Sequence, residues 1–547
     1  MAKPWLMLVG GKWHAFQQAA DVFSGVLAEA LGVKTTVAFD RKALKPAALA
    51  RYGGVLAYTE WGKVTPAEAK ALEAFVQGGG ALVGVHCASD YQPNETLFKL
   101  FGVRFRGHPP VDEFPVTFAD RGHWITHRLD DFRITDEMYL MDVDDSGSQV
   151  LATMHHQGRN LPAVLCRNHG AGRVFYTALG HDARSWSNAT FRKLLSRGAC
   201  WAAGRAEPKA LGVAVVGYGG SFNMGKHHLD SMAAQFGFKP RAICDVSPAR
   251  QLQARQDFPD LAVVGSTKDL LKVDGVDLVT CITPHNVHAP VTVELLNAGK
   301  NVVVEKPMAI DTKECTAMID AARKNKVMVN VYHNRRYDGD FITLRQIVQS
   351  GAVGDVFQIE AFSGGFGEPG TWWRSDKAIS GGIAHDWGAH FLDWITHLVP
   401  GRIKHVIGRF RKKAWVHTTN EDHAQIFVHF ENGCIAEFET SQLAAVGKPK
   451  FRILGEKGGI LQDHNDYVKL FAEASGIRGR EMQVRTAKTV WHRYYQQLGD
   501  YLLLGEALEI TAEEGRRNIA IVEAAEKSSA KGGVPVPVPY EDLIPKA

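Results

Sequence analysis

The sequence lacks most features of an extracellular, membrane or nucleic-acid-binding protein. Its 547 residues include seven cysteines but no C-x-x-C pair, so neither a disulfide framework nor a thiolate zinc site is expected. No apolar run reaches membrane-spanning length, and the apolar stretch at the start is too short for a signal peptide. The net charge of +4 is small for this length and argues against a nucleic-acid or membrane partner. We therefore expect a cytoplasmic protein.

What is present is the composition of a soluble globular protein, 45% apolar and 22% charged, with enough chain for about three or four domains. Repeats and low-complexity tracts are absent from the sequence. The stretch AAGRAEPKA at 202–210 is small, charged and interrupted by proline, which is typical of an exposed linker. We predict a first domain over 1–204, a linker over 205–210, a second domain over 211–335 and a third over 336–547.

The first 204 residues alternate between apolar strands and helical patterns. Strands are predicted at 4–10, 35–39, 52–58, 81–85 and 172–179, with helices at 19–31 and 66–77. This alternation predicts a doubly wound α/β layer, whose site would lie at the carboxyl ends of the strands. The polar and reactive residues at those ends are His14, Glu60, His86, Cys87 and His181.

Four motifs carry a family resemblance in this half: GKWHAF (11–16), GVHCASD (84–90), DEMY (136–139) and GRVFYTALGHD (172–182). With them the region resembles the ThuA-like, trehalose-utilisation family, whose fold is similar to class I glutamine amidotransferases. A glutaminase would need cysteine at a tight G-x-C-x-G elbow. Here His86 takes that position and Cys87 follows it, so we reject glutaminase chemistry.

The candidate site of this half is His14, Glu60, His86 and His181. The histidines could bind a metal or a sugar, or could simply be hydrogen-bonded in a vestigial pocket. Both readings stay open, and no metal is assigned. Six more histidines are expected in loops, as surface or packing residues: His108, His123, His127, His155, His156 and His169.

The stretch from Leu211 to Asp230 organises the second half. An apolar strand ends in the glycines 217, 219 and 220, and a helix start follows Gly225. Strand, glycine turn and helix N-terminus form a pyrophosphate cradle. Asp245 ends the next apolar run about 20 residues later, where a carboxylate meets the adenosine ribose. The spacing is stretched by an insertion of three residues, Phe222, Asn223 and Met224.

Five β-α units in about 125 residues indicate a Rossmann domain. The matching motifs TPxxxH (283–288), EKPMA (305–309), NRRY (334–337) and GGIAHDWGAHFLD (381–393) are highly specific together. With them the half from Leu211 onward resembles the Gfo/Idh/MocA family of sugar and polyol dehydrogenases. The resemblance implies an open, mostly antiparallel sheet in the second part, a last helix over 512–530 that packs against the Rossmann layer, and a dimer or tetramer. Alternating runs after Gly354 agree with the sheet.

The resemblance also implies the site. Its catalytic residues are Lys306, Asp386 and His390, with His390 preferred as the acid/base. Asp386 and His390 are four apart, so on a helix they share one face and the carboxylate could fix the imidazole tautomer. Tryptophans beside charged groups suit a sugar, which adds Tyr337, Trp372, Trp373 and Arg374 as substrate contacts. The predicted cofactor contacts are Gly217, Gly219, Gly220, Phe222, Asn223, Met224, Asp245, Thr283, Pro284, His285, His288, Glu305, Lys306 and Asn334.

These predictions give an NAD-dependent oxidoreductase of a sugar or glycoside, fused to a ThuA-like domain that binds or processes a related keto-sugar. Asp245 favours NAD over NADP, since a carboxylate repels a 2′-phosphate, while Ser247 and Arg250 keep NADP open. Two alternatives stand beside this interpretation. One is a redox glycosidase that oxidises, eliminates, adds water and re-reduces with NAD retained. The other is a sensor that holds NAD and sugar without turnover.

Overall fold

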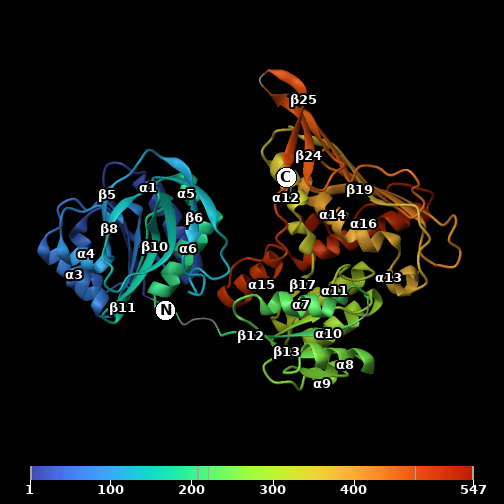
Figure 1. Cartoon of the computed structure of the whole chain (residues 1–547), viewed down its shortest axis with the longest axis horizontal. Helices are drawn as coiled ribbons and strands as arrows, with labels where there is room; N and C mark the ends of the chain where they lie inside the picture. The colour runs from blue at the N-terminus through green and yellow to red at the C-terminus, as the bar shows by residue number, and fades with distance from the viewer. Residues whose placement is uncertain (1–2, 206–208, 220, 475, 545–547) are drawn as a thin grey trace. The chain divides into compact units, whose positions relative to one another are not determined.

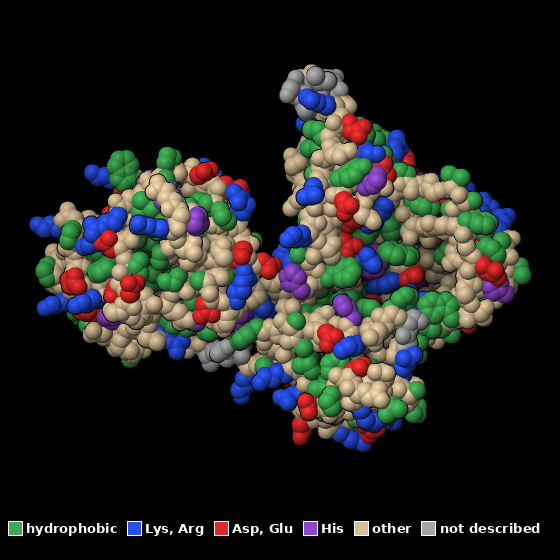
Figure 2. Space-filling model, viewed as in Figure 1, with side chains coloured by type: hydrophobic (Ala, Val, Ile, Leu, Met, Phe, Trp, Pro, Cys, Tyr) green, Lys and Arg blue, Asp and Glu red, His purple; other side chains and the backbone are tan. Residues whose placement is uncertain are grey.

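The computed structural model describes residues 3–205, 209–219, 221–474 and 476–544. The chain divides into two compact units, Met1–Pro208 and Lys209–Ala547, and each is described by itself. Within the described ranges no helix is long and apolar enough to cross a bilayer. Basic and acidic side chains are interspersed over the visible face of both units (Figure 2), in keeping with the small net charge.

The first unit is built on a nine-stranded sheet in the order β2-β1-β3-β4-β11-β10-β9-β6-β7. The strands from β2 to β11 in this order are parallel, and the remaining four are antiparallel. The bounds are β1 Trp5–Gly10, β2 Thr35–Ala38, β3 Gly54–Thr59, β4 Ala81–Val85, β6 Asp112–Phe118, β7 Phe132–Asp136, β9 Gln149–His156, β10 Arg159–His169 and β11 Gly172–Thr177, with β5 Val103–Gly107 and β8 Leu140–Val143 forming a separate pair.

Helices cover both faces of the parallel part, as the alternation predicts. Helix α1 packs with α6, and α3 packs with α4 on the opposite side of the sheet (Figure 1). The bounds are α1 Phe16–Leu31, α2 Pro46–Leu49, α3 Pro66–Gln77, α4 Glu95–Phe101, α5 Ala183–Trp186 and α6 Ala189–Ala202.

The antiparallel extension was not predicted, and it corrects one expectation. His155 and His156 end β9 and His169 ends β10, so these three histidines lie on strands instead of in loops. The local hydrophobic pattern of the sequence does not reveal these strands, because they pair with strands that are distant in sequence. Strand β9, for example, pairs with β6 as well as with β10.

The second unit begins with a six-stranded parallel sheet in the order β14-β13-β12-β15-β16-β17. Counted along the chain this is 3-2-1-4-5-6, the order of a dinucleotide-binding sheet, with its switch point between β12 and β15. The bounds are β12 Leu211–Val216, β13 Phe238–Cys244, β14 Ala262–Val264, β15 Leu278–Cys281, β16 Asn301–Val304 and β17 Val329–Val331, with α7 Met224–Ala233, α8 Pro248–Asp257, α9 Thr267–Leu270, α10 His288–Asn297 and α11 Thr312–Asn325.

An eight-stranded sheet completes this unit in the order β19-β20-β21-β18-β22-β23-β24-β25, antiparallel except where β18 meets β21. Helices α14 and α16 pack against it (Figure 1). The bounds are β18 Val356–Gly364, β19 Ile403–Arg411, β20 His423–Phe430, β21 Ile435–Ser441, β22 Phe451–Gly455, β23 Gly458–Gln462, β24 Tyr467–Ala474 and β25 Ile477–Arg485, with α12 Gly339–Gln349, α13 Lys377–Ser380, α14 Ile383–Leu398, α15 His492–Leu504 and α16 Ala512–Ala530.

Helix α16 belongs to two hydrophobic cores. Ala512 and Ile519 are buried in the core of the parallel sheet, whereas Ile521 and Ala525 are buried in the core of the larger sheet. The helix begins with a capping box between Thr511 and Glu514, which satisfies the free N–H groups of its first turn. The predicted last helix therefore has the predicted bounds, and it packs back on the Rossmann layer.

Candidate functional site

The glycine turn after β12 is tied to the end of the next strand. Gly217 has φ +95°, and a Cβ there would lie 2.3 Å from the carbonyl oxygen of Ile282, so only glycine fits without a shift. The N–H groups of Tyr218 and Gly219 donate to Asp245 Oδ2 over 2.8 and 3.3 Å. Asp245 thus lies beside the glycine turn, and its contact with a ribose stays a prediction. Gly220 lies outside the described residues.

The first two residues of the insertion, Phe222 and Asn223, are exposed, whereas Met224 begins α7 and packs against the core of the parallel sheet. Phe222 and Asn223 have φ of 71° and 51°, a region that L-residues other than Asn and Asp rarely adopt. The Phe222 side chain is 71% exposed, and its ring centroid lies 6.4 Å from that of Trp372. The Arg374 guanidinium lies 5.5 Å from the same ring. Phe222 therefore meets the predicted substrate residues Trp372 and Arg374, while the Arg250 side chain packs over Gly219 of the turn.

A chain of hydrogen bonds between buried side chains follows β16. Glu305 Oε1 lies 3.1 Å from His228 Nε2, and His228 Nδ1 lies 2.6 Å from the hydroxyl of Tyr495. Glu305 Oε2 accepts from Lys306 N over 2.8 Å. Burial alone would raise the pKa of Glu305, but His228 and Lys306 lower it below its usual value. Sequence reasoning missed His228 and Tyr495, although a histidine one turn into the helix after the glycines was a visible signal.

Lys306 and Asp386 form the centre of the site. Lys306 Nζ donates to Asp386 Oδ1 over 2.6 Å, and Arg374 Nη1 donates to the same oxygen over 3.0 Å. Burial works to raise the pKa of Asp386, but the two cations outweigh it and hold the pKa below its usual value. The carboxylate is therefore ionised at neutral pH and fixes the ammonium group in place.

His390 lies one turn further along α14 and is almost fully buried. Burial, together with the charges of Lys306 and Arg335, holds its pKa well below the usual value, so the imidazole is neutral. We expected Asp386 to fix its tautomer, but the partners of that carboxylate are Lys306 and Arg374. The shared helix face was predicted correctly and the pairing was not.

A cavity of about 560 Å³ adjoins this ion pair. Its walls include His285, Trp372, Arg374, Asp386, Trp387 and Asn420. The imidazole of His285 is held by the Ser380 carbonyl over 2.8 Å and by an edge-on contact with Trp373. Two indoles, a cation and a carboxylate around one space give both the apolar faces and the hydrogen-bonding groups that a polyhydroxylated ligand needs.

The predicted substrate contact Tyr337 does not line this cavity. The Tyr337 hydroxyl donates to Glu509 over 2.9 Å, and its ring is buried in the core of the parallel sheet. His288 lies between the carbonyl oxygens of Pro307 and Thr283, at 2.9 and 2.8 Å, so it joins the two turns that carry Pro284 and Lys306. Asn334 begins a short 3-10 turn after β17.

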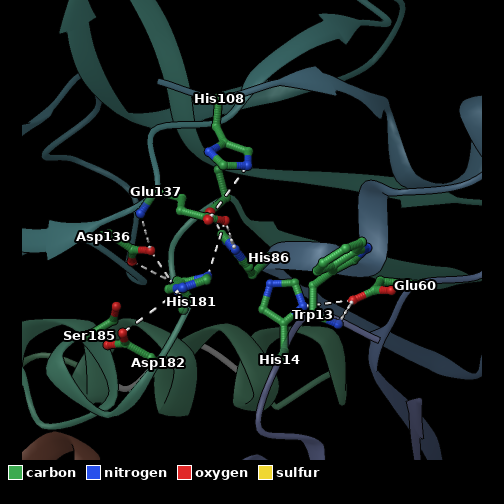
Figure 3. Close-up of polar contacts among 12 residues, drawn as sticks. Trp13, His14, Glu60, His86, His108, Asp136, Glu137, His181, Asp182 and Ser185 are labelled. Atoms are coloured by element: carbon green, nitrogen blue, oxygen red, sulfur yellow. Dashed lines mark hydrogen bonds and ion pairs between the residues drawn. The ribbon is translucent and has the colours of Figure 1, made fainter. Parts of the chain in front are cut away.

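In the first unit the structure brings the four predicted residues together and adds Glu137 (Figure 3). His14 Nδ1 lies 2.9 Å from Glu60 Oε1. The rings of His14, His86 and His181 are 5.1 to 5.6 Å apart, centroid to centroid. Glu137 follows β7 within the DEMY motif, which was noticed for the resemblance but given no role.

The electrostatics of this group follow from burial and from one carboxylate. Burial, reinforced by His86, lowers the pKa of His14 to about 4. Burial alone would raise the pKa of Glu137, but His86, His181 and His108 lower it below its usual value. Cys87 is fully buried and burial raises its thiol pKa. Burial thus favours the protonated thiol of Cys87, and His86 occupies the turn after β4 with φ 46°.

Comparison with known families covers most of the chain. Residues 6–202 match the ThuA family, described as trehalose utilisation. Residues 211–333 match the oxidoreductase family with an NAD-binding Rossmann fold, and residues 341–461 match the GFO/IDH/MocA C-terminal domain. The chain is a ThuA domain fused to a Gfo/Idh/MocA oxidoreductase.

The Gfo/Idh/MocA part has relatives of nearly its own length. A scyllo-inositol 2-dehydrogenase (NADP(+)) of Bacillus subtilis is 27% identical over 349 residues, which is 60% of this chain and 96% of the relative. An inositol 2-dehydrogenase of Corynebacterium glutamicum is 26% identical over 289 residues, 49% of this chain and 82% of the relative. The structure of an NAD-binding protein from Listeria innocua has a TM-score of 0.55 at 25% identity and covers 61% of this chain and 98% of its own.

Proposed function

We propose that the Gfo/Idh/MocA oxidoreductase oxidises a ring carbinol of a sugar or cyclitol with NAD as the hydride acceptor. The observation that carries this proposal is the Lys306–Asp386 ion pair beside a cavity walled by Trp372 and Arg374. The names of the two inositol dehydrogenase relatives support a polyhydroxylated ring as substrate.

The residues around the glycine turn fit a dinucleotide. The turn lies at the switch point of a 3-2-1-4-5-6 sheet, Gly217 has no room for a side chain, and Asp245 stands at the end of β13 to meet a ribose. Bound NAD supplies the hydride acceptor. Asp245 favours NAD over NADP through its charge, while Arg250 is exposed near Gly219 and is the residue that would accept a 2′-phosphate.

Side chains of the protein then accept the proton of the substrate hydroxyl and stabilise the oxygen that loses it. Neutral His390 takes that proton at a ring nitrogen. Lys306 Nζ, held by Asp386, donates a hydrogen bond to the same oxygen and stabilises the negative charge that develops there. Trp372 and Arg374 orient the ring, because indole faces cover its C–H groups and the guanidinium binds its hydroxyls.

The test is a panel of sugars, glycosides and inositols with the full-length protein and either NAD or NADP, followed by absorbance of the reduced cofactor. Reduced cofactor that accumulates in proportion to oxidised substrate supports a dehydrogenase. Glycoside cleavage without such accumulation would instead indicate the redox glycosidase. Binding of cofactor and sugar without any conversion would indicate a sensor.

For the ThuA domain we propose a role on the keto-sugar that the oxidoreductase forms, because the two are fused. The full-length protein and its His86→Ala variant are compared by mass spectrometry of the products. Loss of a second conversion in the variant, with the first oxidation unchanged, supports the role. Identical products from both proteins contradict it. The expected homo-oligomer stays a prediction for size-exclusion chromatography with light scattering.

A further inference from the structure

The first unit gathers four potential metal ligands at the ends of four strands. His14 follows β1, His86 follows β4, Glu137 follows β7 and His181 follows β11. One ligand atom from each lies within 4.8 Å of all the others. Figure 3 shows the three imidazoles and the carboxylate turned toward a common centre.

The imidazole of His14 has one nitrogen lone pair without a hydrogen-bond partner among the described residues. Glu60 already accepts from the backbone N–H groups of Lys12 and Trp13, so it is an acceptor and His14 Nδ1 must donate to it. The unprotonated Nε2 is buried and has no hydrogen-bond partner among the described residues. The His14 side chain is only 4% exposed, so bulk solvent does not reach this atom.

The imidazole of His86 places an acceptor nitrogen beside an acceptor oxygen, an arrangement that a cation would stabilise. His86 Nδ1 donates to the carbonyl oxygen of Ala178 over 2.7 Å, because a carbonyl only accepts. In the neutral ring Nε2 is then an acceptor, yet it lies 3.3 Å from Glu137 Oε2. Two acceptors at this distance repel each other unless a positive charge lies between them. A proton or a metal ion can supply that charge.

The third imidazole favours the metal ion. His181 Nδ1 lies 3.1 Å from the same Glu137 oxygen, but this buried atom makes no hydrogen bond with any described residue. One proton between His86 and Glu137 would leave both His14 Nε2 and His181 Nδ1 unsatisfied. One ion reached by all four side chains would use every one of these atoms.

We propose that His14, His86, His181 and Glu137 bind one divalent transition-metal ion. Three imidazoles and one carboxylate suit zinc, iron or cobalt, whereas magnesium and calcium prefer all-oxygen ligands. Glu60 and the Ala178 carbonyl orient the first two imidazoles as outer-shell partners. The side chains of His181 and Glu137 are 20% and 12% exposed, so a small oxygen ligand can reach the ion from that side.

The experiment uses tag-free, full-length protein that is stripped with a chelator, loaded with Zn²⁺ and desalted before elemental analysis. We expect about one equivalent of Zn²⁺ per chain, and less than about a tenth in His86→Ala and His181→Ala. Glu137→Gln keeps the shape but loses the charge, so its affinity falls about 10-fold or more. The matched control is His155→Ala, an exposed histidine of the same unit, which keeps the full equivalent.

A second measurement needs no variant. Co²⁺ added to the stripped protein gives visible absorption bands of a four- or five-coordinate site, and Zn²⁺ then abolishes them. Zinc retained at the wild-type level by His86→Ala and His181→Ala overturns the proposal. Folded wild-type protein that binds no metal and gives no cobalt bands overturns it as well. Either result would mean that protonation of the four side chains, without a metal ion, stabilises the cluster. Neither readout depends on the oxidoreductase activity.

Discussion

Lys306 Nζ donates to Asp386 Oδ1 over 2.6 Å and joins the turn after β16 to the first turn of α14. The pair thus connects the parallel sheet to the helix that packs under the larger sheet. Because Asp386 also binds Arg374, a single carboxylate positions both cations at the edge of the cavity.

Replacing the lysine tests its role directly. Lys306→Met should lower kcat by about 10²- to 10³-fold, the usual cost of removing a hydrogen-bond donor to a developing negative charge, while the affinity for NAD changes little. Steady-state rates and cofactor titration measure the two effects. Lys313→Met, on the exposed face of α11, is the control and should retain full activity. A fall in kcat of less than 10-fold in Lys306→Met contradicts the assignment.

Cofactor preference depends on two side chains of opposite charge. Asp245→Asn removes the negative charge near the ribose and should raise the NADP to NAD ratio of kcat/KM by about 10-fold. Arg250→Ala should lower the same ratio, since it removes the cation that a 2′-phosphate would meet. Rates with both cofactors give the ratio. An unchanged ratio in Asp245→Asn means that the carboxylate serves only the backbone of the glycine turn.

The insertion should influence substrate binding. Phe222 contacts Trp372 and Arg374, and an exposed cation–π contact contributes about 0.5–1 kcal/mol. Phe222→Ala should therefore raise the KM for the sugar by about 2- to 5-fold with kcat unchanged. Leu252→Ala, an exposed apolar residue on α8, should leave both constants as they are. A change confined to the KM for NAD would assign Phe222 to the cofactor instead.

The stability of the second unit should fall in mild acid because of His333. Burial lowers the pKa of this imidazole to about 4, so the folded state holds it neutral where the unfolded chain protonates it. The free energy of unfolding is therefore unaffected by this group above pH 6.5. It decreases as the pH falls from 6.5 toward about 4, by up to about 1.4 kcal/mol per pH unit.

Denaturant unfolding at several pH values, followed by tryptophan fluorescence, measures the slope of the free energy of unfolding against pH. In His333→Gln the slope between pH 6.5 and 4 should be shallower than in the wild type, since one titrating group is gone. The exposed His464, replaced in His464→Gln, serves as the control. Equal slopes in the wild type and His333→Gln would show that other groups account for the acid sensitivity.

Local signals carried most of the fold prediction. Helix α3 has the predicted bounds because Thr65 and Glu68 form a capping box and Pro66 opens the first turn. Strand β4 is a short apolar run that follows three glycines, 78–80, and was also predicted to the residue. The strands between 103 and 169 were missed, because their partners are distant in sequence and no local pattern specifies the pairing.

The site shows the same division. Spacing placed Asp386 and His390 on one helix face, and placed Asp245 beside the glycine turn. Spacing could not show that Asp386 pairs with Lys306, since that contact joins separate elements. Glu137 was missed for the same reason. A carboxylate after a strand becomes noticeable only when three histidines from other strands are seen around it.

Helix α16 has a consequence for how the molecule is made. Ile519 fills the core of the parallel sheet and Ile521 fills the core of the larger sheet, yet both come about 190 residues after β17, the last strand of the parallel sheet. The Rossmann layer therefore cannot complete its interior until α16 has been synthesised, although its own strands emerge much earlier. A nascent chain arrested before Thr511 should stay protease-sensitive throughout the second unit while the ThuA domain is already resistant.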